Sequence, residues 1–231
     1  MKGLEDFQNG QRLIIDNPQN WTSIQVVNKL RWHIRKTMDI KKIKVGHAGT
    51  LDPLATGLLV ICTGKMTKQI NEFQAQIKEY TGTITLGSTT PSFDLETDIN
   101  QTYPTEHITE KLVHETTKQF IGDIEQYPPV FSAIKKDGKR LYEFARAGES
   151  VEIKSRTINI SEFEITRFQN NEVDFRVVCS KGTYIRSLAN DFGKALQSGG
   201  HLSTLRRTKI GGFHVDNALS IENFIENLPS E

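Results

Sequence analysis

The 231-residue sequence has few of the features that mark exported, membrane-spanning or disulfide-linked proteins. Its two cysteines, Cys62 and Cys179, lie far apart and in no metal-like spacing, which argues against a disulfide scaffold and suits a reducing compartment. The longest aliphatic stretch, 58–62, is far too short to span a membrane, and no apolar signal core opens the chain. We therefore expect a cytoplasmic protein that does not enter a membrane.

Motifs for phosphate loops and metal sites are also missing. Gly64-Lys65 lacks the earlier glycine and the following Ser or Thr of a P-loop, and no GxGxxG occurs. Asp94, Glu96 and Asp98 alternate as in a calcium loop, but Ile99 occupies the position of the required glycine. We therefore expect a solvated acidic loop there, and we assign no metal ligands.

Charge is nearly balanced over the whole chain but is unevenly distributed. Lys and Arg number 29 against 28 Asp and Glu, a net charge of +1. Residues 29–47 nevertheless contain seven Lys or Arg and one acid, and residues 135–156 contain seven against four. Residues 201–214 contain three Lys or Arg and no acid, whereas residues 216–231 contain four acids and no Lys or Arg. Basic segments gathered on one face would bind phosphates, although a charge run is also commonly a solvated helix face.

Apolar spacing predicts mixed α and β structure without repeats or a linker, which favours one domain. Thr22 to Gln25 forms a capping box, and Ile24, Val27, Leu30 and Ile34 follow at helical spacing, so we expect a basic-faced helix from Thr22.

Three further segments have clear periodicity. Residues 80–86 alternate as a strand, and 163–168 and 173–177 form a hairpin around Asn170-Asn171. A helix beginning after Gly182-Thr183 carries Arg186 in its first turn. Residues 127–148, with paired prolines and interleaved aromatics, are expected to leave the core as an excursion.

The segment 45–63 combines three glycines and Asp52-Pro53 with an apolar run. Proline holds Asp52 out of the helical region, and glycines allow the backbone to approach a ligand closely. Such an aspartate can act as a nucleophile or general base, or it can merely cap the turn.

This loop, GHAGTLDPLATGLL, resembles the catalytic loop of the TruB family of tRNA pseudouridine synthases, whose nucleophilic aspartate lies in a GHxGxLDPxAxG pattern. Further family motifs follow in the same order, and the resemblance spans residues 11–213. They are Lys78-Glu79-Tyr80 with Leu86-Gly87, Gln126-Tyr127-Pro128-Pro129 with Phe131-Ser132-Ala133, Asp137-Gly138-Lys139 with Leu141-Tyr142-Glu143, Ser180 to Arg186, and Leu205-Arg206-Arg207.

The resemblance implies an α+β pseudouridine synthase catalytic fold. Such a fold has a mixed, mainly antiparallel sheet flanked by helices, here as a single domain over 1–231 with a thumb-like insertion at 124–152. The resemblance also implies isomerisation of uridine to pseudouridine at position 55 in the T loop of tRNA, by base flipping and without a cofactor or metal.

Family roles carry over residue by residue. Asp52 matches the catalytic aspartate, Arg186 matches the partner that keeps it ionised, and Tyr80 matches the tyrosine that stacks on the extracted uracil. His47 would support the space left by the flipped nucleotide, and Tyr184 and Leu205 match positions lining the uracil pocket. Ordinary packing is the alternative for the tyrosines and the leucine, and a phosphate contact is the alternative for Arg186.

The expected partner is the T stem-loop of tRNA, and we expect a monomer with no obligate protein partner. Phosphate contacts would offset the cost of flipping the base. The candidate RNA-binding residues are Lys135, Lys136, Lys139, Arg140, Arg206 and Arg207.

The chain departs from the family pattern in two places. Asp16-Asn17-Pro18 replaces the usual Asp-Lys-Pro, so an expected cation is absent. The residues after Phe213 form a short acidic tail, about 214–231, rather than the PUA RNA-binding domain of many members. We therefore expect a T stem-loop fragment to be modified nearly as well as whole tRNA.

Two noncatalytic alternatives remain. Residues 46–49 contain a literal GxxG, the backbone clamp of KH domains, which would suit a noncatalytic RNA-binding module. The other is a tRNA chaperone on the same fold. Replacing Asp52 by Asn discriminates, because only an enzyme would lose its function.

Overall fold

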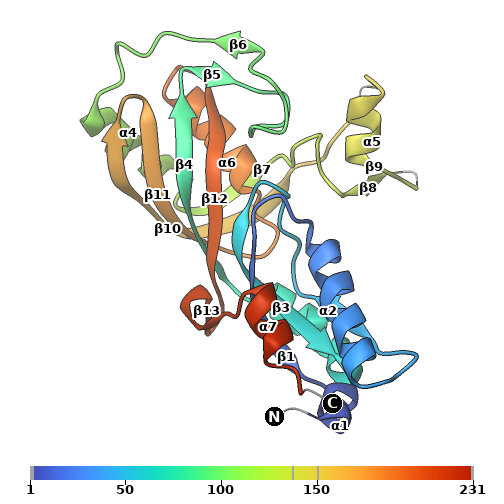
Figure 1. Ribbon diagram of the computed structural model, residues 1–231. Coiled ribbons are helices and arrows are strands. Elements are labelled where there is room, and N and C mark those ends of the chain that lie inside the picture. Colours follow the sequence, from blue (N-terminus) through green and yellow to red (C-terminus); the bar gives the residue numbers. More distant parts are fainter. Residues whose placement is uncertain (1–2, 137, 150, 230–231) are drawn as a thin grey trace. The chain divides into compact units, whose positions relative to one another are not determined.

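The structure, a computed structural model, describes residues 3–136, 138–149 and 151–229. Asp137, part of the expected Asp-Gly turn, lies outside the described residues. The chain divides into two units: unit 1 is 1–80 with 205–231, and unit 2 is 81–204 (Figure 1). The boundary falls within β4 (Lys78–Leu86) and β12 (Gly200–Ile210), so both strands contribute to both units. The single domain expected from the sequence stays a prediction.

Unit 1 is built around strand β3, which begins four residues after Asp52 in the sequence. β3 pairs antiparallel with β1 and β2 and parallel with β12, and β12 pairs antiparallel with β13. The elements confined to this unit are α1 (Leu4–Asn9), β1 (Arg12–Asn17), α2 (Ser23–Thr37), β2 (Val45–His47), β3 (Thr56–Thr63), η1 (Gly64–Gln69), α3 (Ile70–Ala75), β13 (Phe213–His214), η3 (Val215–Asn217) and α7 (Ile221–Glu226).

Both faces of β3 are buried, which explains its unbroken apolar sequence. Leu59 and Ile61 join the core formed with α2, β1 and α7. Leu58, Val60 and Cys62 face a second core that contains Phe73 and Ile210. The residues between β2 and β3 are therefore attached to the most buried strand of unit 1.

In unit 2 the strand order is β12-β4-β11-β10-β7. β10 pairs antiparallel with both β11 and β7. The elements confined to this unit are β5 (Ser88–Thr89), β6 (Gln101–Thr102), α4 (Glu110–Thr116), η2 (Thr117–Phe120), β7 (Gly122–Gln126), β8 (Lys135–Lys136), β9 (Lys139–Arg140), α5 (Leu141–Arg146), β10 (Arg156–Gln169), β11 (Glu172–Cys179) and α6 (Ile185–Ala195).

Phenylalanine rings fill the core of unit 2 between the sheet and α6. The Phe192 ring of α6 lies 5.3 Å from Phe163 of β10, and Phe163 lies 6.0 Å from Phe175 of β11. Edge-to-face pairs of this kind contribute beyond the area they bury. They pack the second half of α6 against the sheet.

The expected α+β fold with a mixed, mainly antiparallel sheet and helices is confirmed. The hairpin is also confirmed, because Asn170 and Asn171 adopt φ of 52° and 63°, as a two-residue type I′ turn requires. The segment 127–148 does leave the core: β8 and β9 form a separate two-stranded sheet, followed by α5 (Figure 1).

The helix expected at Thr22 is confirmed, with Thr22 as its cap, but one position on its apolar face is wrong. Ile24 is 55% exposed, whereas Val26 is fully buried. The buried face of α2 is therefore formed by residues 23, 26, 27, 30 and 34. Within the described ranges, no helix is both long and apolar enough to cross a membrane.

Candidate active site

The segment between β2 and β3, residues 48–55, is called the Asp52 loop below. Backbone hydrogen bonds hold this loop in place. Within the loop, Ala55 N–H donates to the Asp52 carbonyl at 2.9 Å, and from outside it Asn20 N–H donates to the Pro53 carbonyl at 2.7 Å. Gly57 follows at φ 104°, where a Cβ would lie 2.4 Å from the Arg207 carbonyl oxygen. Only glycine allows this close approach.

Buried polar side chains hold the Asp52 loop in unit 1. The Ser23 hydroxyl, at the start of α2, accepts a bond from Leu51 N–H at 2.9 Å. The Asn17 amide donates to Ala55 O at 3.4 Å and also to Pro18 O and Trp21 O. Asn17, in the position where the family usually has lysine, therefore joins the segment 18–21 to the Asp52 loop instead of supplying a charge.

Arg207 completes this support and corrects a prediction. It is 1% exposed, and its guanidinium donates to Leu58 O at 2.8 Å, Gly49 O at 3.1 Å and Thr50 O at 3.5 Å. A buried guanidinium engaged by carbonyl oxygens is not placed to meet an RNA phosphate. Alternation along β12 is the signal that could have shown this, because neighbouring residues of a strand point to opposite faces.

Arg206, the neighbour of Arg207, is partly exposed. It forms a two-pronged pair with Asp16, with Nη1–Oδ1 at 3.1 Å and Nη2–Oδ2 at 2.7 Å. Its RNA contact stays a prediction.

His47 ends β2 just before the Asp52 loop. Burial and, secondarily, the Arg207 charge hold its pKa below the ordinary value. A backbone hydrogen bond at Gly49 raises the pKa, but it is the smallest of the three effects. A neutral imidazole is therefore expected at neutral pH.

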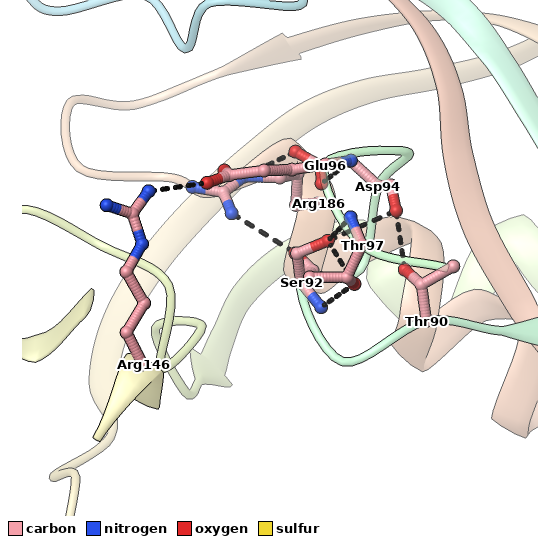
Figure 2. Close-up of polar contacts among 7 residues, drawn as sticks. All are labelled: Thr90, Ser92, Asp94, Glu96, Thr97, Arg146 and Arg186. Atoms are coloured by element: carbon pink, nitrogen blue, oxygen red, sulfur yellow. Dashed lines mark hydrogen bonds and ion pairs between the residues drawn. The ribbon is translucent and has the colours of Figure 1, made fainter. Parts of the chain in front are cut away.

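In unit 2, Arg186 lies in the first turn of α6 and is almost fully buried. Its Nε lies 3.5 Å from Asp94 Oδ2, and both side chains are at most 6% exposed. Its Nη1 donates to the Ser92 carbonyl at 3.1 Å. Figure 2 shows Arg186 pointing into the loop that carries Ser92 and Asp94.

That loop is built to hold Asp94. The Asp94 carbonyl accepts from the hydroxyls of Thr90 at 2.6 Å and Ser92 at 3.1 Å, and Ser92 Oγ lies 2.8 Å from Thr97 Oγ1 (Figure 2). Phe93 adopts φ 64°, a left-handed conformation that costs a bulky residue free energy and that clusters at functional sites.

The expected solvated acidic loop is therefore wrong for Asp94 and correct for its neighbours. Glu96 is exposed and forms an ion pair with Arg146 at 3.2 Å, and Asp98 is exposed. No local pattern distinguishes Asp94 from these two acids, because its partner lies 92 positions further along the sequence.

The other expected uracil-site residues occupy both units. Tyr80 is buried on β4, and Leu205 is half-buried on β12. Tyr184 caps α6, where its backbone N–H donates to Gln126 Oε1 at 2.8 Å and its ring lies 4.7 Å from the Arg156 guanidinium. Asp52, His47, Tyr80 and Leu205 belong to unit 1, and Tyr184 and Arg186 to unit 2. The pairing of Asp52 with Arg186 stays a prediction.

The basic residues of the 127–148 segment form a small hairpin. Lys135, Lys139 and Arg140 are exposed, and Lys136 Nζ donates to the Glu152 carbonyl at 2.9 Å. Lys139 lies 5.6 Å from the Phe144 ring. Among the described residues, no three His, Cys, Asp or Glu side chains gather as a metal site.

Comparisons with known proteins extend over nearly the whole chain. Residues 35–185 match the family described as TruB family pseudouridylate synthase (N terminal domain), and 186–228 match the tRNA pseudouridylate synthase B C-terminal domain. A curated protein named tRNA pseudouridine synthase B, from Flavobacterium johnsoniae, is 65% identical to this chain, and the match covers 97% of this chain and 98% of that protein. A protein of the same name from Phocaeicola vulgatus is 58% identical, and the match covers 98% of this chain and 96% of that protein.

Among solved structures, the fold resembles a chain in the crystal structure of a Cbf5-Nop10-Gar1 complex, with a TM-score of 0.71 and 29% identity. The match covers 95% of this chain and 54% of that chain, so this chain spans about half its length.

The fold and these matches identify an enzyme of the pseudouridine synthase class. The chain belongs to the TruB family of pseudouridylate synthases.

Proposed function

We propose that this enzyme forms pseudouridine in tRNA, at position 55 of the T loop, with Asp52 as the catalytic carboxylate. The observation that carries the proposal is the 65% identity, over nearly the full chain, to a protein named tRNA pseudouridine synthase B. The buried supports of the Asp52 loop favour a catalytic role over a mere turn cap, since Ser23, Asn17 and Arg207 all hold this one segment.

The reaction rearranges uridine without adding or removing atoms overall. The bond from N1 to C1′ breaks, the uracil turns, C5 bonds to C1′, and the C5 hydrogen leaves while N1 gains a proton. Asp52 would attack the ribose, abstract a ribose proton or add to the uracil ring. Each route requires an ionised carboxylate beside the base, and none requires a cofactor or metal.

Arg186 is proposed to pair with Asp52 and to keep it ionised and oriented. Asp94 and the Ser92 carbonyl support this role by holding the buried guanidinium in one direction. Asp94 is then a positioning residue that acts through Arg186.

The remaining site residues are proposed to receive the flipped nucleotide. Tyr80 would stack on the uracil, Tyr184 and Leu205 would line its pocket, and a neutral His47 would support the vacated space. The exposed cations of the 127–148 segment would contact phosphates of the T arm, with RNA shape setting specificity. We further propose that the enzyme works in the cytoplasm, as a monomer.

The test uses a T stem-loop RNA with tritium at uridine C5, incubated with the protein in EDTA. Release by the wild type and none by Asp52→Asn, with RNA binding retained, would support metal-free catalysis through Asp52. A variant that keeps full release would refute the role of Asp52. No release by the wild type from either the stem-loop or whole tRNA would favour the noncatalytic alternative, a tRNA chaperone.

A further inference from the structure

The solvent-facing side of α2 exposes a large aromatic side chain. Trp32 is 52% exposed, although tryptophan is normally largely buried. The opposite side of α2 packs Val27, Leu30 and Ile34 into the core of unit 1. Because that packing fixes the helix, the indole is presented to solvent from a rigid element.

Three cationic residues of α2 neighbour this indole: Lys29, Arg35 and Lys36. Lys29 and Lys36 lie three positions before and four after Trp32, the spacings that place side chains side by side on a helix. Lys36 Nζ lies 5.1 Å from the centre of the indole ring, and Arg35 is exposed beside it. Over the residues that the structure describes, none of these three cations forms an ion pair with a carboxylate.

The neighbouring histidine reports the local positive charge. The His33 ring meets Trp32 edge-on at 4.5 Å. Its pKa is lowered by burial and by the charges of Lys29 and Lys36. This side of α2 therefore combines a planar apolar surface with uncompensated positive charge, and the segment 29–47 contains seven Lys or Arg against one acid.

We propose that Lys29, Trp32, Arg35 and Lys36 form a docking surface for RNA, separate from the Asp52 loop. An unpaired base stacks on the indole, and the cations contact the flanking phosphates. Aromatic rings among cations are the pattern by which proteins hold unpaired nucleotides, because every base offers a π-face. The inference rests on the proposed function in one respect, that the substrate is RNA.

Tryptophan emission tests the contact directly, because the chain has two tryptophans, Trp21 and Trp32. Trp21 packs against the core of unit 1. The probe is an unmodified tRNA transcript added to the full chain. We expect quenching in Trp21→Phe, which retains Trp32, and little change in Trp32→Phe. If Trp21→Phe does not fold, the difference between wild type and Trp32→Phe gives the same readout.

Affinity gives a second readout. Trp32→Ala should bind the transcript about ten-fold more weakly, as expected when one stacked base is lost. The matched control is Ile24→Ala, an equally exposed apolar residue on α2 that lies outside the cation cluster. Its affinity should stay within about two-fold of wild type, since isolated exposed apolar residues carry little energy.

Two other polyanions separate base stacking from charge alone. Inorganic polyphosphate should leave Trp32 emission unchanged, because it has no base. Quenching by a poly-aspartate peptide equal to that by tRNA would overturn the proposal in favour of an acidic protein partner. Unquenched Trp32 at saturating tRNA would overturn it as well.

The C5 tritium assay keeps this inference distinct from the proposed function. Release of tritium without quenching of Trp32 would refute the docking surface alone. Quenching of Trp32 without release would refute pseudouridine formation and leave an RNA-binding surface.

Discussion

Arg186 is oriented within unit 2 by the Asp94 carboxylate and by the Ser92 carbonyl oxygen. An amide at position 94 keeps the shape of the side chain but removes its charge. We expect Asp94→Asn to lower kcat by about 10- to 100-fold, because the buried Arg186 guanidinium loses the charge of its ion-pair partner. Affinity for tRNA should stay near wild type, because Asp94 is buried and its carboxylate is not exposed to a ligand.

Glu96→Gln is the matched control, since Glu96 lies two residues away and pairs with an exposed Arg146. Single-turnover tritium release and filter binding give kcat and affinity separately. An equal loss in Glu96→Gln, or a loss of affinity with unchanged kcat in Asp94→Asn, would contradict the assigned role.

Arg207 and Arg206 are neighbours in sequence with different expected phenotypes. Arg207→Gln should lower kcat by loosening the Asp52 loop, and it should raise the pKa of His47, because a nearby positive charge is removed. Arg206→Gln should instead weaken tRNA binding and reduce the salt slope by about one, because the predicted phosphate contact is lost.

Nitrogen NMR of His47 and the salt dependence of tRNA binding check the two halves of this prediction. Arg207→Lys keeps the charge but not the three hydrogen bonds, so it should keep the low pKa of His47 and still lose turnover. If Arg207→Gln changed the salt dependence of tRNA binding, that result would support the RNA contact that the sequence predicted for Arg207.

The first turn of α2 links helix stability to the Asp52 loop. Thr22 caps the helix through the Gln25 N–H, and the next residue, Ser23, holds Leu51. Thr22→Ala should cost about 1 kcal/mol, which lowers Tm by about 2–4 °C in a chain of this length. Calorimetry tests this, with Thr22→Ser as the control that keeps the cap. Equal Tm values for the two variants would contradict it.

Elements whose determinants lie close together in the sequence could be predicted. The cap at Thr22, the Asn170-Asn171 turn and the start of the helix before Arg186 each depend on a few consecutive residues. The contacts that support the site could not be predicted. The Asp94–Arg186 ion pair and the Arg207–Gly49 hydrogen bond join positions that are far apart in the sequence. The prediction for Ile24 was wrong for a related reason. Periodicity indicates which face of a helix is apolar, but contacts with the rest of the fold decide which residues at the border of that face are buried.

The distribution of charge over the chain matters more for RNA binding than its net value of +1. We expect tRNA affinity to fall by about 100-fold between 50 and 200 mM salt, as for roughly four phosphate contacts. Fluorescence anisotropy with labelled tRNA measures the slope. A flat salt dependence would show that the basic segments do not meet the RNA backbone.

Both native thiols are hidden from reagents. Cys62 and Cys179 are buried, and burial raises the pKa of Cys62 to about 11. Thiolate is the form that reacts with maleimides, so the natural protein should be almost inert to them. A single cysteine placed on an exposed position, such as Asn28→Cys on α2 or Lys111→Cys on α4, would then take a dye selectively. The chain is thus ready for site-specific labelling and single-molecule observation without first removing its own cysteines.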